Sequence, residues 1–494
     1  MSRSHRALTT LLTWSTMSFL PVLLSLLTSA SVDPLVFDDE RPTTLLPLYA
    51  VTDADLRAQE LVYERLFSQE ALRSEPTSRL IARWALRGTD LVLTVDPRLR
   101  FADGHRVDAE DVCFSIDAVL EPANPVPWAG EHRRALVGCE VEGASTAVVR
   151  FARPVPDRRA WLDIALLPAH RFESTTVPED HPLAREALGT RGMTATMEET
   201  GIVYRSTDRK RSIRALGLRW DLDLEDVRAG RAHGMPMASA ELEPGENLLE
   251  RRFDTGDTWF VLVQPRDVLA SVTTRIALDR AIDRTALRAA IWGDGADDPS
   301  PVSAVVTAAV RPSSPYYDQT IAPRPQATLP PGTLERLRLG IGEAQEAAKP
   351  GLGRAIADQL VAQGVEVEIV ELPGDPLTVG YDRARLQGLD LLLGRWVSRL
   401  PNHLRPLVHP EGSHNPFGVA TPERMRLLEV LETAETDAAY VEAARALHRT
   451  AFEEVHAIWL VSGGERSVWT ERLTRAPVTP LYYWSEIGSW RLAE

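Results

Sequence analysis

The sequence predicts an α/β protein with more than one lobe. Its 494 residues are enough for two or three lobes, each with a buried core. Residues 91–120 predict a strand from Leu91 to Val95, a tight turn at Asp103-Gly104, and a helix that Asp108 caps and that ends at Leu120. A βαβ-like unit follows later, with strands at 337–341 and 365–370 on either side of a helix at 352–363. Strands that alternate with helices in this way are typical of α/β folds.

Other segments add elements in chain order. A strand starts at Val36, and a helix at 56–67 has Asp53 or Asp55 as its cap. Further strands are predicted at 135–139, 147–151, 259–263 and 457–460. Ser271 is expected to cap one amphipathic helix that Gly293 ends. Helices are also predicted at 427–434, opened by Thr421-Pro422-Glu423, and at 438–455.

Composition restricts the class of protein. An apolar content of 44% and a charged content of 25% are ordinary for a globular protein. The formal net charge is -15, whereas a nucleic-acid-binding protein needs a basic face. We therefore expect no nucleic-acid partner.

The N-terminus predicts a secretory signal peptide over residues 1–30. Arg3 and Arg6 form a basic start, residues 11–27 are mostly apolar, and small residues at 28–30 suit cleavage. An uncleaved membrane anchor is the alternative, but the segment is short and contains hydroxyls and a proline. No cysteine stands near the cleavage site, so we expect no lipid anchor and a protein that is free in the periplasm.

The chain has two cysteines, Cys113 and Cys139. An even number in an exported protein permits a disulfide. Two buried, reduced cysteines are the alternative. The sequence leaves both possibilities open.

Three stretches have specific residue patterns that an α/β fold in general does not require. They are residues 93–115, with Arg100-Phe101, Asp103-Gly104 and Ala109-Glu110-Asp111-Val112; residues 275–284; and residues 390–396. In these motifs, and in their order from Thr44 to Leu460, the sequence resembles the extracellular solute-binding proteins of peptide-type and nickel-type ABC transporters (solute-binding family 5). It departs from that family at Gly189–Met193, where the usual Pro-Tyr pair is missing, and it lacks a helix that the family commonly has after the proline-rich segment 322–332.

The resemblance implies a bilobed type II periplasmic-binding fold with an extra inserted lobe. The expected divisions are a signal peptide (1–30), a discontinuous lobe I (31–48, 185–264 and 458–494), the inserted lobe (49–184) and lobe II (265–457). A ligand would be trapped by closure of the lobes and delivered to an ABC permease in the inner membrane. We expect a monomer.

The same resemblance indicates the ligand-binding residues. Peptide binders of the family carry an aspartate, three residues after the tryptophan that aligns with Trp396, which pairs with the α-amine of the peptide; here that position is Arg399. An arginine would repel an ammonium group and could instead bind a carboxylate or phosphate. We therefore expect an anionic ligand, unless Arg399 points to solvent or the register is shifted. Arg395 and Asn402 lie in the same segment. Trp396 and Trp259 are candidate aromatic walls, with a core role favoured for Trp259.

Other functions find less support. His403, His409 and His414 follow the expected cleft, but their spacing does not match a metal site, and solvated histidines are favoured. His170 has no partner at ligand spacing. The nucleotide-loop pattern at Gly340-x-Gly342 lacks its third glycine. Motifs of hydrolases, zinc proteases and P-loop enzymes are absent, so we expect no enzyme activity and no cofactor. The alternative to transport is a degenerate binding protein that acts as a sensor.

Overall fold

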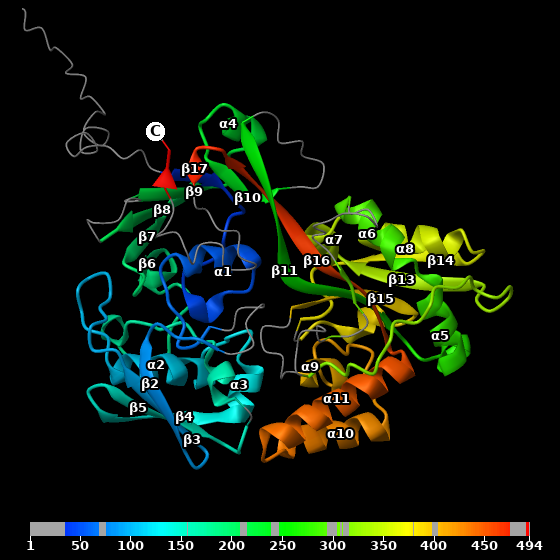
Figure 1. Cartoon of the computed structure of the whole chain (residues 1–494), viewed down its shortest axis with the longest axis horizontal. Helices are drawn as coiled ribbons and strands as arrows, with labels where there is room; N and C mark the ends of the chain where they lie inside the picture. The colour runs from blue at the N-terminus through cyan, green and yellow to red at the C-terminus, as the bar shows by residue number, and fades with distance from the viewer. Residues whose placement is uncertain are drawn as a thin grey trace, which may run out of the picture.

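The computed structural model describes residues 35–68, 76–155, 157–207, 215–238, 247–293, 304–306, 309, 316–378, 380–397, 404–474 and 491–493. The predicted signal peptide lies outside these ranges. Figure 1 shows two halves that lie side by side and are joined by two long strands, β11 (Leu248–Val263) and β16 (Ala457–Thr470). We call the side with β1–β10 and α1–α4 the first half, and the side with β12–β15 and α5–α11 the second half.

One large sheet runs through both halves. Its twelve described strands are ordered β14-β13-β15-β11-β16-β10-β1-β9-β8-β7-β6, with β12 paired to β16 off this path. The strands of the first half are β1 (Leu35–Asp38), β6 (Glu186–Leu188), β7 (Met193–Met197), β8 (Gly201–Ser206), β9 (Ala215–Arg219) and β10 (Gly234–Ala238). Those of the second half are β12 (Ala304–Val305), β13 (Arg336–Gly342), β14 (Glu366–Leu372) and β15 (Leu391–Val397).

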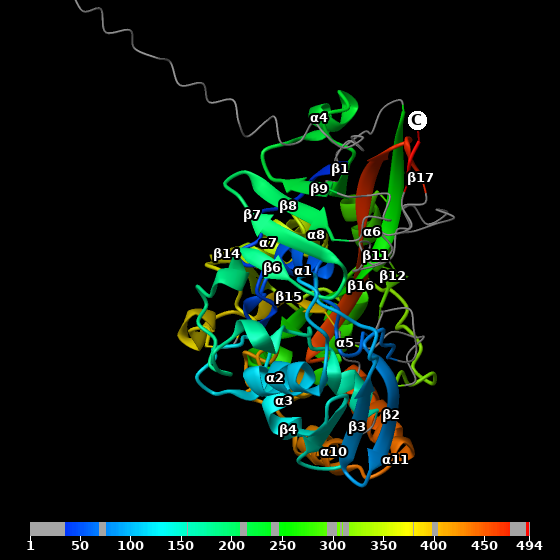
Figure 2. The same ribbon diagram turned by 90° about the vertical axis from the view of Figure 1, so that its left-hand side faces the viewer.

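The centre of this sheet is antiparallel and its flanks are partly parallel. β11 pairs with β16 from Leu248↔Thr470 to Leu262↔Ala457, with register shifts between Asp254 and Thr258 and again after Trp259. β13 is parallel to both β14 and β15, and β1 is parallel to both β9 and β10. The predicted βαβ unit is β13, α8 (Leu352–Val361) and β14. Figure 2 shows β11 and β16 as a continuous ribbon along the molecule.

A second sheet belongs to the first half. It has the order β2-β3-β5-β4, formed by β2 (Ile81–Arg87), β3 (Asp90–Val95), β4 (Leu136–Gly143) and β5 (Thr146–Phe151). α2 (Ala109–Leu120) packs against it, begins at the predicted cap Asp108, and is joined to β4 by the disulfide Cys113–Cys139. α3 (Gly130–Ala135) leads into β4. That this sheet forms the inserted lobe stays a prediction, as do the expected domain boundaries.

Two helix predictions need correction. The helix predicted to run from Ser271 to Gly293 is two helices, α5 (Val272–Ala281) and α6 (Arg284–Trp292), because Ile282 is extended and Asp283 caps a new helix. The helix predicted over 56–67 is α1 (Asp53–Glu60), which starts earlier because Thr52 caps it. It also ends earlier than predicted, because the backbone N–H groups of Leu66 and Phe67 donate to the carbonyl oxygens of Ile164 and Leu162 instead of continuing the helix. The remaining helices are α4 (Leu224–Arg228), α7 (Glu343–Ala348), α9 (Arg405–Val408), α10 (Pro422–Thr433) and α11 (Asp437–Glu454).

Strand β11 carries two cores of the second half on its two faces. Trp259, Val261 and Val263 pack with α5, α6 and α8, whereas Phe260 and Leu262 pack with α9, α10 and α11. This division follows from the alternation of side chains along a strand. Trp259 is fully buried, in the core role that the sequence favoured. No helix in the described ranges is both long and apolar enough to cross a bilayer.

Candidate ligand-binding site between the two halves

The N-terminus of α1 is held rigidly by one buried carboxylate. Asp55 accepts hydrogen bonds from the backbone N–H groups of Thr43 (2.6 Å), Val51 (3.0 Å) and Thr52 (2.9 Å). Thr52 caps the helix in return, because its hydroxyl accepts from the N–H of Asp55. This arrangement fixes the first turn of α1 and presents Asp53, its first residue, toward the second half.

Asp53 meets Arg395 of β15. The Nη2 atom of Arg395 lies 2.5 Å from Oδ2 of Asp53 and 3.0 Å from Oδ2 of Asp257 on β11. Burial acts to lower the pKa of Arg395, but the carboxylates of Asp257 and Asp53 outweigh it and raise the pKa above its ordinary value. The guanidinium is therefore a permanent cation where the halves meet. In Figure 1, α1 and β15 lie on opposite sides of β11.

The sheet brings Trp259 to this cluster and turns Trp396 away from it. Trp259 stands directly opposite Arg395 in the β11–β15 ladder. Trp396, the next residue, lies on the other face of the sheet, is 6% exposed, and packs edge-on against His414 with ring centroids 4.8 Å apart. Arg395 and Trp396 therefore cannot line the same surface of β15. Arg399 and Asn402, the other two predicted ligand-binding residues, lie outside the described residues.

The histidine prediction changes as well. Burial lowers the pKa of His414 to about 4, so this residue is a neutral packing partner of Trp396 and not a solvated side chain. His409 is half-buried, and His403 lies outside the described ranges. Within the described residues, no group of three or more His, Cys, Asp or Glu side chains could hold a metal ion. His170 contacts Asp103, with its Nε2 atom 2.8 Å from Oδ2.

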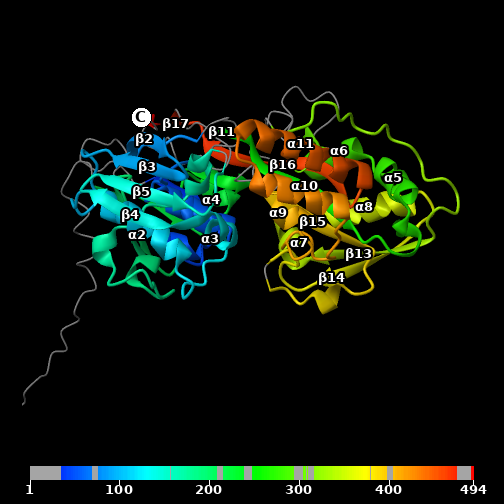
Figure 3. The ribbon, with the colours of Figure 1, turned by 90° about the horizontal axis from the view of Figure 1, so that it is seen from below.

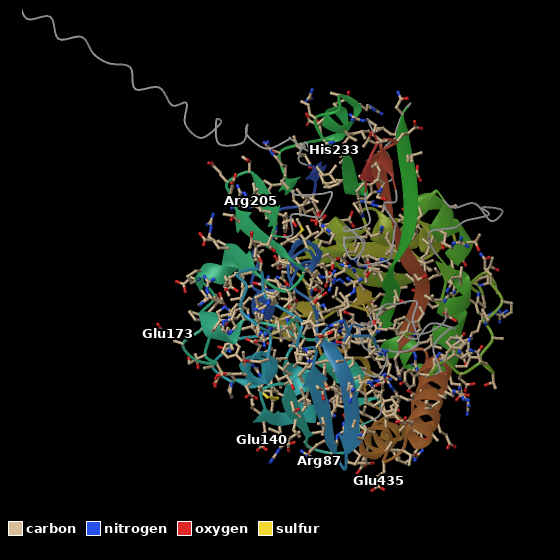
Figure 4. All side chains as sticks on the ribbon, turned by 60° about the vertical axis from the view of Figure 1, so that its left-hand side comes forward. Arg87, Glu140, Glu173, Arg205, His233 and Glu435 are labelled. Atoms are coloured by element: carbon tan, nitrogen blue, oxygen red, sulfur yellow. A yellow bond between two sulfur atoms is a disulfide. The ribbon has the colours of Figure 1, made fainter. Side chains whose placement is uncertain are left out.

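A second polar contact joins the halves just after β5. Nη1 of Arg153, just after β5, donates to the carbonyl oxygen of Glu432 in α10. Glu432 also pairs with Arg405 at 2.5 Å. Burial raises the pKa of Glu131 in α3, and the nearby arginines partly oppose it. Figure 3 shows α3 beside α9 and α10, and Figure 4 places Glu435, which follows α10, on the same side of the molecule as Arg87 and Glu140 of the four-stranded sheet.

Sequence reasoning missed Asp53 and Asp257 as site residues. Asp53 was considered only as a helix cap, although Thr52 in the preceding position already supplies that function. Asp257 lies within β11, two residues before the apolar run that begins at Trp259, and is 4% exposed. A carboxylate beside a buried apolar run must be paired, and that requirement is the signal that could have identified it.

The fold of the described residues is the type II fold seen in solved substrate-binding proteins of peptide and nickel ABC transporters, so the predicted bilobed α/β fold class is confirmed, whereas the extra inserted lobe stays a prediction. No protein-family model and no curated protein sequence matches the chain.

Solved structures match it over nearly the full length of both chains. CtaP of Listeria monocytogenes, an ABC transporter substrate-binding protein, aligns with a TM-score of 0.80 and 15% identity, covering 94% of this chain and 99% of CtaP. The oligopeptide-binding protein AppA of Bacillus subtilis, solved with a nonapeptide, aligns with a TM-score of 0.73 and 16% identity over 94% and 99% of the two chains. AgaA from A. tumefaciens R10, solved with agropinic acid, aligns with a TM-score of 0.72 and 14% identity, also over 94% and 99%. At these identities the likeness is one of fold.

Proposed function

We propose that this protein is exported through residues 1–30 and captures a small solute between its two halves for an ABC permease in the inner membrane. The single observation that carries the proposal is the ion cluster of Arg395, Asp53 and Asp257, which lies where the halves meet within the fold of substrate-binding proteins. A ligand that contacts both halves stabilises the state in which they are together, and so drives closure. The protein works as a monomer, without catalytic activity of its own.

We further propose that the ligand carries a carboxylate or phosphate and is not an ordinary peptide with a free α-amine. Two arginines support this: Arg395 at the junction, and Arg399 at the position where the resembled peptide binders carry an aspartate. A planar guanidinium binds such anions through paired hydrogen bonds. Asp53 is the more exposed partner of Arg395, with 38% of its side chain exposed against 5% for Asp257. An incoming anion therefore displaces Asp53 and leaves Asp257 in place.

Calorimetry after native mass spectrometry tests the proposal. The mass spectrum of the purified protein identifies any ligand that co-purifies, and calorimetry then compares that ligand with free-amine di- to pentapeptides. We expect an anionic ligand whose affinity falls when Arg399→Ala or Arg395→Gln is introduced. Arg385→Ala, an exposed arginine of the second half, is the matched control and should leave affinity unchanged. Micromolar binding of a free-amine peptide that Arg399→Ala abolishes would overturn the anionic ligand.

A sensor role without transport is the second candidate. The observation that favours it is that Asp53 already supplies, from inside the chain, a counter-charge to Arg395 across the two halves. Reconstitution with the proposed ABC permease and its ATPase in proteoliposomes distinguishes the two roles. Ligand-stimulated ATP hydrolysis supports transport, whereas ligand binding with no effect on hydrolysis supports the sensor.

A further inference from the structure

A separate cavity lies inside the second half, between β11 and β16 and the helices α9, α10 and α11. Its volume is about 50 Å³, and its walls are mostly apolar, with Leu262, Leu407, Phe417 and Trp459 among the lining residues. One water needs roughly 10–15 Å³ of such space, so the cavity has room for a few waters or a small organic molecule. Leu262 and Trp459 belong to the core on the face of the sheet opposite to Arg395, so this cavity is distinct from the junction between the halves.

Arg424 supplies an under-compensated charge at the cavity wall. It is 5% exposed, and its Nη2 atom donates to the carbonyl oxygen of Leu407 at 3.2 Å. None of the described residues accepts a hydrogen bond from its Nε or Nη1 atoms. Oε2 of Glu454 forms a long ion pair with Nε at 3.8 Å, beyond hydrogen-bonding distance, and this oxygen also has no hydrogen-bond donor among the described residues. A buried guanidinium in this state carries a desolvation penalty that an additional acceptor would relieve.

His448 adds a second donor to the same cavity. Its Nδ1 atom accepts the N–H of Asp318 at 3.1 Å, which assigns the proton of the neutral ring to Nε2. Burial lowers the pKa of His448 to about 4, so the ring is neutral near pH 7. Its buried Nε2 has no hydrogen-bond acceptor among the described residues. The unsatisfied groups of Arg424 and His448 are therefore donors and call for an acceptor.

These donors and the apolar walls together specify the ligand chemistry. Water alone would accept hydrogen bonds from these donors, but the apolar side chains of the walls would then stay in contact with water, which is unfavourable. A carboxylate matches the paired N–H groups of a guanidinium, and a short alkyl tail gains roughly 0.8 kcal/mol for each methylene that it buries. We propose that the second half holds a short-chain monocarboxylate, with its carboxylate on Arg424 and its alkyl tail beside Leu407, Phe417 and Trp459.

Calorimetric titration of the full-length protein with sodium salts tests this site. Formate, acetate, propionate, butyrate and hexanoate are compared at constant ionic strength, with chloride as the blank. We expect saturable binding that tightens as methylenes are added up to butyrate and then weakens when the chain outgrows the cavity. Equal heats for all salts, chloride included, would overturn the proposal.

Four variants locate the site. Ala451→Leu fills the cavity from α11 without changing any charge, and Arg424→Gln removes the cation; we expect each to weaken butyrate binding by about tenfold or more. Arg426→Gln on the same helix removes an exposed arginine that pairs with Glu423, and should change the affinity less than about twofold. If Arg424→Gln fails to fold, Ala451→Leu still decides, and unchanged binding in that variant would refute the site. Arg395→Gln should leave butyrate binding unaffected; a loss there would assign the carboxylate to the junction between the halves instead.

Discussion

The ion pair between Asp53 and Arg395 should help to hold the two halves together. Asp53→Asn keeps the shape of the side chain and removes its charge. The pair is partly exposed, with 38% and 22% of the two side chains accessible, so its contribution is about 1 kcal/mol, at the upper end for ion pairs near the surface. A free energy of about 1 kcal/mol corresponds to a change of roughly fivefold in the ratio of closed to open molecules. The variant should shift that ratio toward the open state by this factor.

Single-molecule energy transfer measures the ratio directly. Dyes on Glu110→Cys in α2 and Glu429→Cys in α10 would report the separation of the halves, and both positions are exposed. The native cysteines are bonded to each other and do not compete for the dyes. Asp96→Asn is the matched control, because it removes an ion pair with Arg98 inside the first half only. High salt should open the wild type and have less effect on Asp53→Asn, since screening weakens the same interaction. An unchanged ratio in Asp53→Asn would refute the assigned role.

Three further predictions concern stability. The disulfide Cys113–Cys139 closes a segment with a sequence separation of 26, so its loss in a double serine variant should lower the free energy of unfolding by about 3 kcal/mol in urea titrations; no change under reducing conditions would contradict this. Burial and nearby carboxylates raise the pKa of Asp38 to about 7 from 3.8, so the folded state gains stability when this group is protonated. That contribution is complete below about pH 4 and is lost as pH rises through about 7; Asp38→Asn should therefore be more stable than wild type at pH 8 and should flatten the pH profile of unfolding. A Cβ atom on Gly189 would lie 2.2 Å from the carbonyl oxygen of Val62, so Gly189→Ala should lower the melting temperature and cost about 2 kcal/mol, and an unaltered melting curve would contradict that close approach.

Elements with strong local signals were predictable from the sequence. The helix capped by Asp108 ends at Leu120 as predicted, and the strands and helix of the βαβ unit agree within two residues. The hydrophobic periodicity, helix caps and flanking glycines that specify these elements lie within a few residues of one another in the sequence. The break between α5 and α6 was not predictable in this way, because apolar residues at Leu278 and Trp292 continue the helical pattern across it.

The lengths of β11 and β16 depend on tertiary pairing. Residues 248–256 contain Glu250, Arg251, Arg252 and Asp254, which show no alternation of apolar and polar residues. They are strand because β16 lies beside them along both halves. The same limit applies to the junction: Asp53, Asp257 and Arg395 are far apart in the sequence, and only the fold brings their charges together. That Trp396 points away from Arg395 was inferable from strand alternation alone.

The way in which β11 and β16 enter the second half also determines how the protein can be divided. Within the described residues, every strand and helix of the second half lies between β11 and β16 in the sequence. A fragment cut at 265–457 would lose both, and with them Trp259, Ile458 and Leu460 from its core. A fragment from 248 to 470 retains all of these residues. Only the outer ends of β11 and β16 would lose neighbours from the first half, such as β10, which pairs with β16. The second half is thus a candidate for independent expression, whereas the first half has to be assembled from pieces on either side of it.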